Sequence, residues 1–364
     1  MAATDHESFL RQADALGWSV AGTTSPNPPV GCVIVNATGQ VVGGGATEPP
    51  REVSPNSQGR HAEIVALDAA GRAAQGATAY VTLEPCNHQG RTSPCAEALV
   101  DAGIAEVHYL FADPGATAGG GAQTLRAAGV AVTGPYVPEG ANPHWFRNQC
   151  GGHRFSVESW LMAQRLGRPS VTLKYAATLN GMAAATDKTS QWITGELARA
   201  DVHSDRCFRD AIIVGTGTVL ADDPQLTARP GGLESPRQPR RVVIGTRELP
   251  ADARVFRATE HAAPATHLRT RNLEDVLAQL WSEGCVDVLV EGGPQLAAEF
   301  LAAGLVDQVR AYLAPAWLPI GLPAMGTAGR TTSTITDIER FSTRSVQVLG
   351  EDILWQLDCP PHRG

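Results

Sequence analysis

Three short segments, His61-Ala62-Glu63, Pro85-Cys86 and Cys95, decide how the first half of this chain folds. The first opens a helical pattern, the second follows a strand-like run, and Cys95 stands where the next helix begins. All three therefore lie at strand–helix junctions of a layered α/β domain. One imidazole and two thiolates supply the three protein ligands of a catalytic zinc ion, which keeps a fourth position for water. We predict His61, Cys86 and Cys95 as zinc ligands.

Glu63 lies two residues after the predicted ligand His61 and is not itself expected to bind the ion. Zinc lowers the pKa of its bound water toward neutrality, which makes a nucleophile available. Attack on an amidine-like carbon then needs a group that takes the water proton and returns it to the leaving nitrogen. The pattern H-x-E followed by P-C and a further cysteine is typical of zinc base deaminases, whose glutamate does this. We predict Glu63 as the catalytic residue.

Each piece of this pattern also has a simpler explanation. A His-x-Glu triplet is frequent by chance, a single buried cysteine is usually a packing residue, and two cysteines can hold a structural zinc. The occurrence of all three pieces in order favours a catalytic site. The remaining cysteines have no ligand-like partners in the sequence, so we expect Cys32, Cys150, Cys207, Cys285 and Cys359 to be structural.

Alternating strands and helices extend along both halves of the chain, which predicts the α/β class. In the first half we predict strands at 30–35, 40–44, 78–83, 106–111 and 130–133, and helices at 62–74, 94–102 and 123–128. In the second half we predict strands at 170–176, 211–214, 241–245, 286–291 and 308–313, helices at 196–209, 273–283 and 294–303, and a closing hairpin of 346–349 with 353–357. A Gly- and Pro-rich stretch between them predicts domains at 1–147 and 169–364, with 148–168 as a linker.

Composition narrows the class of ligand. Lys plus Arg total 29 against 37 for Asp plus Glu, a net charge of -8, which argues against nucleic acid as a partner but not against a small phosphorylated molecule. The sequence shows neither a signal peptide nor a run of about 18 apolar residues, so we expect no membrane segment and a cytoplasmic enzyme. Seven cysteines, an odd number, do not suggest a disulfide framework.

Residues 83–95, LEPCNHQGRTSPC, place eight residues between the two cysteines instead of the two of the general deaminase pattern. This stretch closely resembles the cysteine motif of the bacterial riboflavin-biosynthesis deaminase/reductases, and residues 26–35, PNPPVGCVIV, resemble that family's substrate loop. The resemblance implies a cytidine-deaminase-like three-layer α/β/α domain in which Asn27, His88 and Arg91 contact the substrate. Ser25 and Pro29 depart from the family, where many members have His and Asn.

The second half resembles the reductase domain of the same family in residues 173–181, 190–194 and 214–229. This implies a dihydrofolate-reductase-like α/β domain that uses NADPH. Carried over by motif, the substrate contacts are Lys174, Ser190, Arg206, Leu226, Arg229 and Glu291. The cofactor contacts are Ala177, Trp192, Thr218, Asp222, Thr246, Gly293, Pro294, Gln295 and Leu296. Asn180 and Met182 depart from the family's usual Asp and frequent Arg, and residues 314–321 also depart.

Three residues of this half have chemistry that fits phosphate groups. Arg206 and Arg229 suit a sugar phosphate because guanidinium forms bidentate bonds to its oxygens, although an isolated arginine more often forms a surface ion pair. Arg247, just after a predicted strand, could meet the 2′-phosphate of NADPH. From residues alone, the Glu291-Gly292-Gly293-Pro294 turn is equally consistent with a phosphate site and with a simple tight connection.

The resemblance implies a two-step enzyme of riboflavin synthesis. The first domain would deaminate 2,5-diamino-6-ribosylamino-4(3H)-pyrimidinone 5′-phosphate with one zinc ion, and the second would reduce the ribosyl group to ribityl with NADPH. Three alternatives stay open: a deaminase of another base, a non-catalytic relative, and an active deaminase whose reductase half is impaired. The family also suggests a homo-oligomer.

Overall fold

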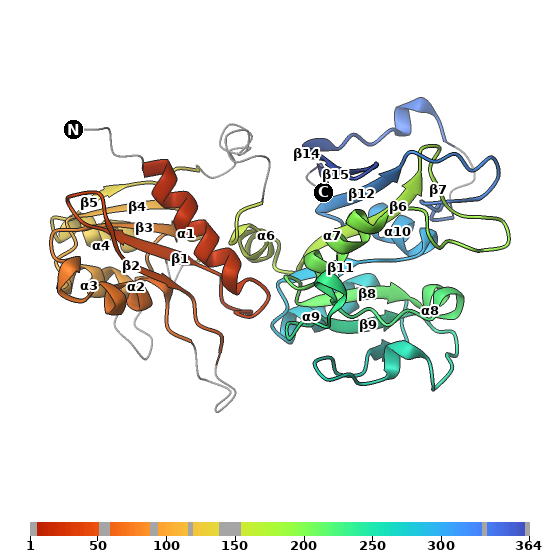
Figure 1. The fold of residues 1–364 in the computed structure, drawn as a ribbon, viewed down its shortest axis with the longest axis horizontal. Helices are drawn as coiled ribbons and strands as arrows, with labels where there is room; N and C mark the ends of the chain where they lie inside the picture. Colours follow the sequence, from red (N-terminus) through yellow and green to blue (C-terminus); the bar gives the residue numbers. More distant parts are fainter. Residues whose placement is uncertain are drawn as a thin grey trace. The chain divides into compact units, whose positions relative to one another are not determined.

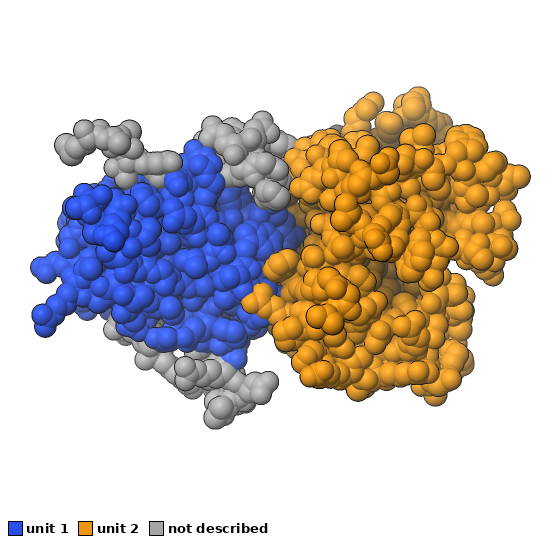
Figure 2. All heavy atoms as spheres, in the orientation of Figure 1, with its two compact units in different colours: residues 1–167 blue, residues 168–364 orange. Residues whose placement is uncertain are grey.

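The computed structural model describes residues 6–50, 59–87, 94–115, 119–137, 154–329 and 333–360. The chain divides into two compact units, Met1–Gly167 and Arg168–Gly364, which Figure 2 distinguishes by colour. Each unit contains its own β-sheet and its own set of helices (Figure 1). Within the described ranges, no helix is both long and apolar enough to cross a bilayer.

Unit 1 is built on a five-stranded sheet of order β2-β1-β3-β4-β5, in which β3, β4 and β5 run parallel and β1 runs antiparallel to β2 and β3. The strands are β1 (Gly31–Val35), β2 (Val41–Ala46), β3 (Thr78–Leu83), β4 (Glu106–Phe111) and β5 (Ala131–Thr133). The helices are α1 (His6–Val20), α2 (Ala62–Ala70), α3 (Cys95–Asp101), α4 (Gly121–Ala127) and α6 (Glu158–Leu166), with a 3-10 turn η1 at Gly71–Ala74. Every residue of β1 is buried, as expected for a strand covered on both faces.

Glycines of β2 show how helices cover both faces of this sheet. A Cβ at Gly43 or Gly45 would lie within 2.5 Å of backbone atoms of α2, whereas a Cβ at Gly44 would meet Leu16 of α1. Because successive strand residues point to opposite faces, α1 and α2 lie on opposite sides of the sheet. α2 also contacts α3, and α3 contacts α4, which makes the second helical layer. Unit 1 is thus the three-layer α/β/α arrangement that was predicted.

Two helices of unit 1 were not expected from the sequence. α1 precedes the first predicted strand, and α6 falls in the segment 148–168 that we predicted as a linker. α6 is attached to unit 1 by the Trp160 indole, which donates to the Pro26 carbonyl at 3.0 Å. Just before this helix, the Ser156 amide donates to Asp14 of α1 at 2.9 Å. These tertiary bonds, which no local pattern reveals, make the segment part of the first unit.

Unit 2 contains an eight-stranded sheet of order β10-β9-β8-β11-β6-β12-β15-β14. The first six of these strands run parallel, and the C-terminal hairpin β14–β15 adds antiparallel to β12. Its strands are β6 (Ser170–Thr178), β8 (Ala211–Gly215), β9 (Arg240–Ile244), β10 (Thr266–Leu268), β11 (Asp287–Val290), β12 (Gln308–Ala314), β14 (Ser342–Leu349) and β15 (Asp352–Asp358). The central strands β8 and β11 are buried apart from Gly215 at the end of β8, as is typical of parallel sheets.

Helices and short elements complete unit 2. They are α7 (Glu196–Arg206), α8 (Thr216–Asp222), α9 (Leu273–Ser282), α10 (Pro294–Ala302), the 3-10 turns η2 (Pro230–Gly232), η3 (Arg254–Phe256) and η4 (Ile335–Asp337), and the small sheet of β7 (Met182–Ala184) with β13 (Leu322–Pro323). The predicted helices and the closing hairpin are present, with ends shifted by a few residues. α8, β10 and the β7–β13 pair were missed because each is too short for a clear periodic pattern.

Candidate functional sites

His61, Cys86 and Cys95 lie together in unit 1, although 34 residues separate the first from the last. Their ligand atoms are all within 4.8 Å of one another. The His61 Nδ1 atom is 3.1 Å from the Cys95 sulfur and 3.5 Å from the Cys86 sulfur. Zinc–nitrogen and zinc–sulfur bonds of about 2.0 and about 2.3 Å can span such separations, so one ion could contact all three atoms. The donor set fits the zinc predicted from the sequence.

Local structure accounts for this convergence. His61 is the N-cap of α2, Cys86 follows β3, and Cys95 is the first residue of α3. The Cys95 amide donates to the Cys86 sulfur at 3.3 Å, and the Ala96 amide donates to the Cys86 carbonyl at 3.2 Å. The first amide groups of α3, which have no partner within the helix, therefore donate to Cys86. This arrangement stabilises negative charge on the Cys86 sulfur.

Glu84, within the cysteine motif, has a structural role that the sequence analysis missed. Its carboxylate accepts from the Ala122 amide at 3.0 Å and from the Asp113 amide at 3.4 Å, so it joins the end of β3 to the segment after β4 and to α4. Gly121 is required at this junction, because a Cβ there would lie 1.8 Å from the Pro85 carbonyl oxygen. The single acidic residue directly before the Pro85-Cys86 pair was the available signal.

Glu63 lies in the first turn of α2 and is only 4% exposed. Burial raises the pKa of its carboxyl to about 7, and the nearby His61 opposes this rise. A hydrogen bond from Cys95 lowers the pKa of Cys86 to about 4, whereas the pKa of the Cys95 thiol is raised by its hydrogen bond to Cys86. Glu63 is thus a desolvated carboxyl beside the ligand cluster, as a residue that exchanges protons in a dry site must be.

The remaining predicted contacts of the first half are placed only in part. Asn27 is half-buried, and its loop is closed by hydrogen bonds between its backbone and Thr24 at 2.9 and 3.0 Å. His88 and Arg91 lie outside the described residues. Their predicted contacts with the substrate stay predictions.

A cavity of about 810 Å³ opens in unit 2 along the carboxyl ends of β8, β9 and β11. Ligands of open α/β sheets bind at such an edge. The predicted residues that line it are Lys174, Ser190, Trp192, Arg206, Thr218, Asp222, Leu226, Arg229, Thr246, Glu291, Gly293, Pro294, Gln295 and Leu296. Ala177 does not line it, because its side chain is fully buried within β6.

Glu291 and Arg206 form a bidentate ion pair at one end of this cavity. Arg206 Nε and Nη2 donate to the two carboxylate oxygens at 2.7 and 2.8 Å, and both side chains are about nine-tenths buried. Lys174 Nζ is 3.9 Å from the same carboxylate. Burial opposes ionisation of Glu291, yet Arg206 holds its pKa below the usual value. Arg206 also donates to the Thr227 carbonyl at 2.9 Å, so all three of its guanidinium nitrogens donate hydrogen bonds to other residues of the protein.

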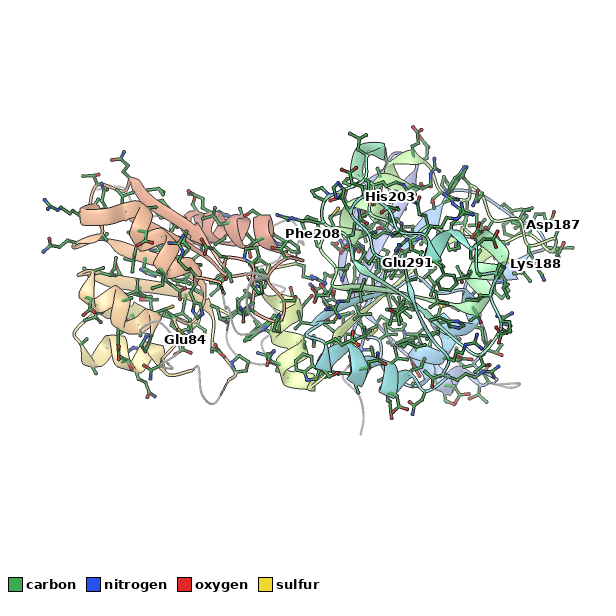
Figure 3. All side chains as sticks on the ribbon, turned by 90° about the horizontal axis from the view of Figure 1, so that it is seen from below. Glu84, Asp187, Lys188, His203, Phe208 and Glu291 are labelled. Atoms are coloured by element: carbon green, nitrogen blue, oxygen red, sulfur yellow. The ribbon has the colours of Figure 1, made fainter. Side chains whose placement is uncertain are left out.

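His203 lines the same end of the cavity and was not predicted. It lies three residues before Arg206 and four after Arg199 in α7, so all three occupy one helical face. This spacing was the signal that the sequence analysis overlooked. In Figure 3, His203 and Glu291 lie within the body of unit 2, whereas Asp187 and Lys188 lie at its periphery.

The charge state of His203 predicts a pH effect on stability. Burial, with Arg206 and Arg229 nearby, lowers its pKa to about 4, and its Nδ1 accepts from the Arg229 amide at 3.2 Å. The unfolded chain therefore binds a proton at this residue before the folded chain does, and stability falls as the pH drops through about 6.5 toward about 4. We expect His203→Gln to reduce this loss by on the order of 1 kcal/mol, allowing for partial exposure. Urea unfolding at about pH 7.5 and about pH 5 measures the free energy of unfolding of both proteins. An equal loss of this free energy in the wild type and in His203→Gln would contradict the prediction.

Other predicted residues approach one another along the cavity. The Ser190 hydroxyl is 3.4 Å from the Asp222 carboxylate, and the Arg199 guanidinium lies 4.4 Å from the centre of the Trp192 ring. Trp192 is 69% exposed and lines the cavity, so its ring is not part of the core. A Cβ at Gly293 would lie 3.3 Å from the Thr218 hydroxyl, which shows how closely the turn before α10 approaches α8.

Asn180, where the family usually has Asp, is explained by its contacts. Its amide nitrogen donates to the Leu318 carbonyl at 2.8 Å, and its oxygen accepts from the Thr178 hydroxyl at 2.8 Å and from the Leu318 amide at 3.3 Å. A carboxylate could not donate to that carbonyl. Asn180 and Met182 do not line the cavity. These two departures therefore do not change the lining of the cavity.

Comparisons with known proteins agree with both sites. Residues 3–111 match the cytidine and deoxycytidylate deaminase zinc-binding region, and residues 169–354 match the RibD C-terminal domain. The riboflavin biosynthesis protein RibD of Corynebacterium ammoniagenes is 46% identical over 346 residues, which cover 94% of this chain and 95% of the relative. This chain belongs to the riboflavin-biosynthesis deaminase/reductase family.

Further relatives match over nearly the full length of this chain. RibD of Mycobacterium tuberculosis is 45% identical over 93% of both chains. The solved structure of Acinetobacter baumannii RibD, form 1, is 35% identical, covers 98% of this chain and 99% of its own, and superposes with a TM-score of 0.80. A Thermotoga maritima structure, described as a diaminohydroxyphosphoribosylaminopyrimidine deaminase/5-amino-6-(5-phosphoribosylamino)uracil reductase, is 29% identical with the same coverage and TM-score.

Family membership confirms the predicted fold class, a cytidine-deaminase-like domain followed by a dihydrofolate-reductase-like domain. It also confirms the bifunctional activity. The chain is a zinc-dependent hydrolase that deaminates the phosphorylated pyrimidine and an NADPH-dependent oxidoreductase that reduces its ribosyl group. No comparison favours the alternative of an impaired reductase.

Proposed function

We propose that the deamination step is carried out in unit 1 by the residues predicted from the sequence. His61, Cys86 and Cys95 would hold the zinc ion, which supplies a water of lowered pKa when bound. Glu63 accepts the proton of that water and returns it to the leaving nitrogen, so that ammonia departs. One observation supports this assignment. The ligand atoms of His61, Cys86 and Cys95 all lie within 4.8 Å of one another, and the buried carboxyl of Glu63 lies beside them.

For the second step, we propose that the sugar of the substrate binds at the end of the cavity with Lys174, Arg206 and Glu291. NADPH supplies the hydride, and the protein chiefly aligns the ribose C1 atom with the nicotinamide. The Glu291 carboxylate, fixed by Arg206, offers acceptors to sugar hydroxyls. Arg229 lies beside them and is the candidate for the sugar phosphate, since burial and the nearby Arg206 and Arg254 lower its pKa and favour an anion there.

The reductase assignment predicts the effect of Glu291→Gln. We expect it to lower NADPH oxidation at least about tenfold while ammonia release is unchanged, because it removes a charged acceptor from the proposed sugar site. It should also lower the free energy of unfolding by about 3 kcal/mol, since the buried Arg206 loses its counter-charge. Initial rates and urea unfolding measure both effects.

A double variant separates binding from stability in this prediction. Glu291→Gln combined with Arg206→Met removes both charges of the buried pair, so most of the lost stability should return. Reductase activity should stay low. Recovery of activity together with stability would show that Glu291 acts only through folding.

A coupled assay tests the whole proposal. The full chain loaded with zinc is incubated with the pyrimidine substrate and NADPH, and ammonia and NADPH are followed together. We expect ammonia release in the absence of NADPH and NADPH oxidation only after deamination. Ammonia without NADPH oxidation would support the impaired-reductase alternative, and neither signal would contradict the proposal. The cytoplasmic location and the homo-oligomeric state stay predictions.

A further inference from the structure

Lysine is rare in this chain, and its two lysines, Lys174 and Lys188, both line the cavity of unit 2. Lys188 is exposed and lies at the periphery of the unit (Figure 3), whereas the side chain of Lys174 is only 20% exposed. Lys174 Nζ is 3.9 Å from the Glu291 carboxylate, which is too far for a hydrogen bond. Burial lowers the pKa of Lys174; Glu291 opposes this effect and Arg206 adds to it. A long, flexible side chain in this setting needs a further contact to stay charged and in place.

Tyr312 supplies that contact. Lys174 Nζ lies 5.7 Å from the centre of the Tyr312 ring, within the range of a cation–π interaction. Tyr312 of β12 is paired with Ala176 of β6, so it shares a face of the sheet with Lys174, two residues before Ala176. Tyr312 is only 1% exposed and is not among the residues that line the cavity. The ring can therefore act on a ligand in the cavity only through Lys174.

The Tyr312 hydroxyl is fixed by two charged residues. It donates to the Asp201 carboxylate of α7 at 2.5 Å and accepts from Arg310 Nη2 at 3.1 Å. Arg310 is paired with Lys174 across β12 and β6, where two cations repel each other. The ion pair of Arg310 with Asp201, at 2.6 Å, directs its guanidinium toward α7. Tyr312 is thereby held in one orientation, and the space beside its ring is left to the Lys174 ammonium group.

We propose that Tyr312 is a positioning residue of the reductase, whose ring holds the Lys174 ammonium group charged and directed at the sugar of the substrate. The inference rests on the proposed placement of the sugar beside Lys174 and Glu291. The face of an aromatic ring is electron-rich, so it stabilises the charged amine over the neutral one. It does so without a hydrogen bond, and the three ammonium donors stay available to Glu291 and to sugar hydroxyls.

Nuclear magnetic resonance of the zinc-loaded full chain, with lysine labelled with carbon-13 at its ε position, tests this inference. Because the chain has two lysines, Lys188→Arg identifies both signals. In the wild type, the ε-protons of Lys174 should lie upfield of their position in the urea-unfolded chain, since protons over the face of an aromatic ring are shielded. This shift should persist in Tyr312→Phe, which keeps the ring, and disappear in Tyr312→Leu. The titration midpoint of Lys174 should fall by at least about half a pH unit in Tyr312→Leu and stay close to the wild-type value in Tyr312→Phe.

The KM of the deaminated intermediate is the second readout. Tyr312→Leu should raise it at least about threefold, because Lys174 loses its fixed place beside the sugar, and the conservative Tyr312→Phe should restore it to within about twofold of the wild type. Both variants lose the hydrogen bond to Asp201, so both should unfold at a lower urea concentration than the wild type. A purely structural role of Tyr312 would make KM follow stability and not the presence of the ring.

Phe300→Leu is the matched control, because Phe300 is a fully buried ring of unit 2 that belongs to a different hydrophobic cluster from Tyr312. It should lower stability without moving the titration midpoint of Lys174. An upfield shift that is absent in the wild type would overturn the proposal even if Tyr312→Leu does not fold. A Lys174 midpoint in Tyr312→Leu equal to that of the wild type would overturn it as well.

Lys174→Met separates this inference from the proposed sugar site. A wild-type KM in Lys174→Met would show that the sugar does not bind beside Lys174, which would overturn the site and the role of Tyr312 together. A raised KM in Lys174→Met with a wild-type KM in Tyr312→Leu would overturn the role of Tyr312 alone. A raised KM in both variants, with rescue in Tyr312→Phe, is the expected result.

Discussion

Replacing Glu63 by Gln is expected to lower the rate of ammonia release about a hundredfold to about ten-thousandfold, the range that a positioned acid–base group contributes. The amide has nearly the same shape but cannot accept the water proton or return it to the leaving nitrogen. Glu63 is only 4% exposed, so bulk water is poorly placed to substitute for it. Steady-state release of ammonia from the pyrimidine substrate is the measurement.

Two further measurements make this result specific to the carboxyl group. Zinc content should stay near one ion per chain, because Glu63 is not one of the three converging ligands. NADPH oxidation should be normal when the deaminated intermediate is supplied directly. Ammonia release within about threefold of the wild type would show that another group moves the proton.

Replacing Cys86 by Ala is the second change with a large expected effect. Two ligands remain, His61 and Cys95, and they cannot retain zinc as a set of three does. We expect the bound zinc to fall from about one ion per chain to almost none, and ammonia release to become undetectable. Elemental analysis after dialysis, combined with the ammonia assay, measures both.

A second cysteine variant serves as the control for this loss. Cys285 is a buried thiol of unit 2 and is not part of the ligand cluster. Cys285→Ala should keep zinc and ammonia release, and Cys86→Ala should keep NADPH oxidation with the deaminated intermediate. Full zinc content in Cys86→Ala would mean that Cys86 does not bind the metal.

The local signals of the sequence were sufficient for most of the regular elements. β3 and β4 have the predicted bounds, because each is rich in the β-branched and aromatic residues that favour strands. The predicted helix 62–74 is divided in the structure: α2 ends at Ala70, before Gly71 with a φ of 52°, and residues 71–74 form the 3-10 turn η1. α6 was predicted as linker because its hydrogen bonds to Asp14 and Pro26 are tertiary and leave no trace in a local pattern. α1 was overlooked although its buried residues Leu10, Ala13 and Gly17 have helical spacing.

Single residues of the reductase half show what a motif cannot reveal. Arg206 was predicted as a substrate contact from its position, but its bidentate pair with Glu291 depends on two chain segments 85 residues apart. His203 was overlooked although its helical spacing from Arg206 was visible in the sequence, but its burial near Arg206 and Arg229 is a property of the tertiary structure alone. The departure at Asn180 is accounted for by Leu318, 138 residues away.

The sequence by itself determined the predicted zinc site of this protein. One imidazole and two thiolates at strand–helix junctions, with a carboxyl group two residues from the imidazole, are typical of zinc base deaminases. It also determined the strands and most of the helices, because those depend on neighbouring side chains. Only the tertiary structure decided which polar groups are desolvated, paired or directed into a cavity. Those properties depend on distances between segments remote in the chain, and such distances are set by how the sheets and helices pack.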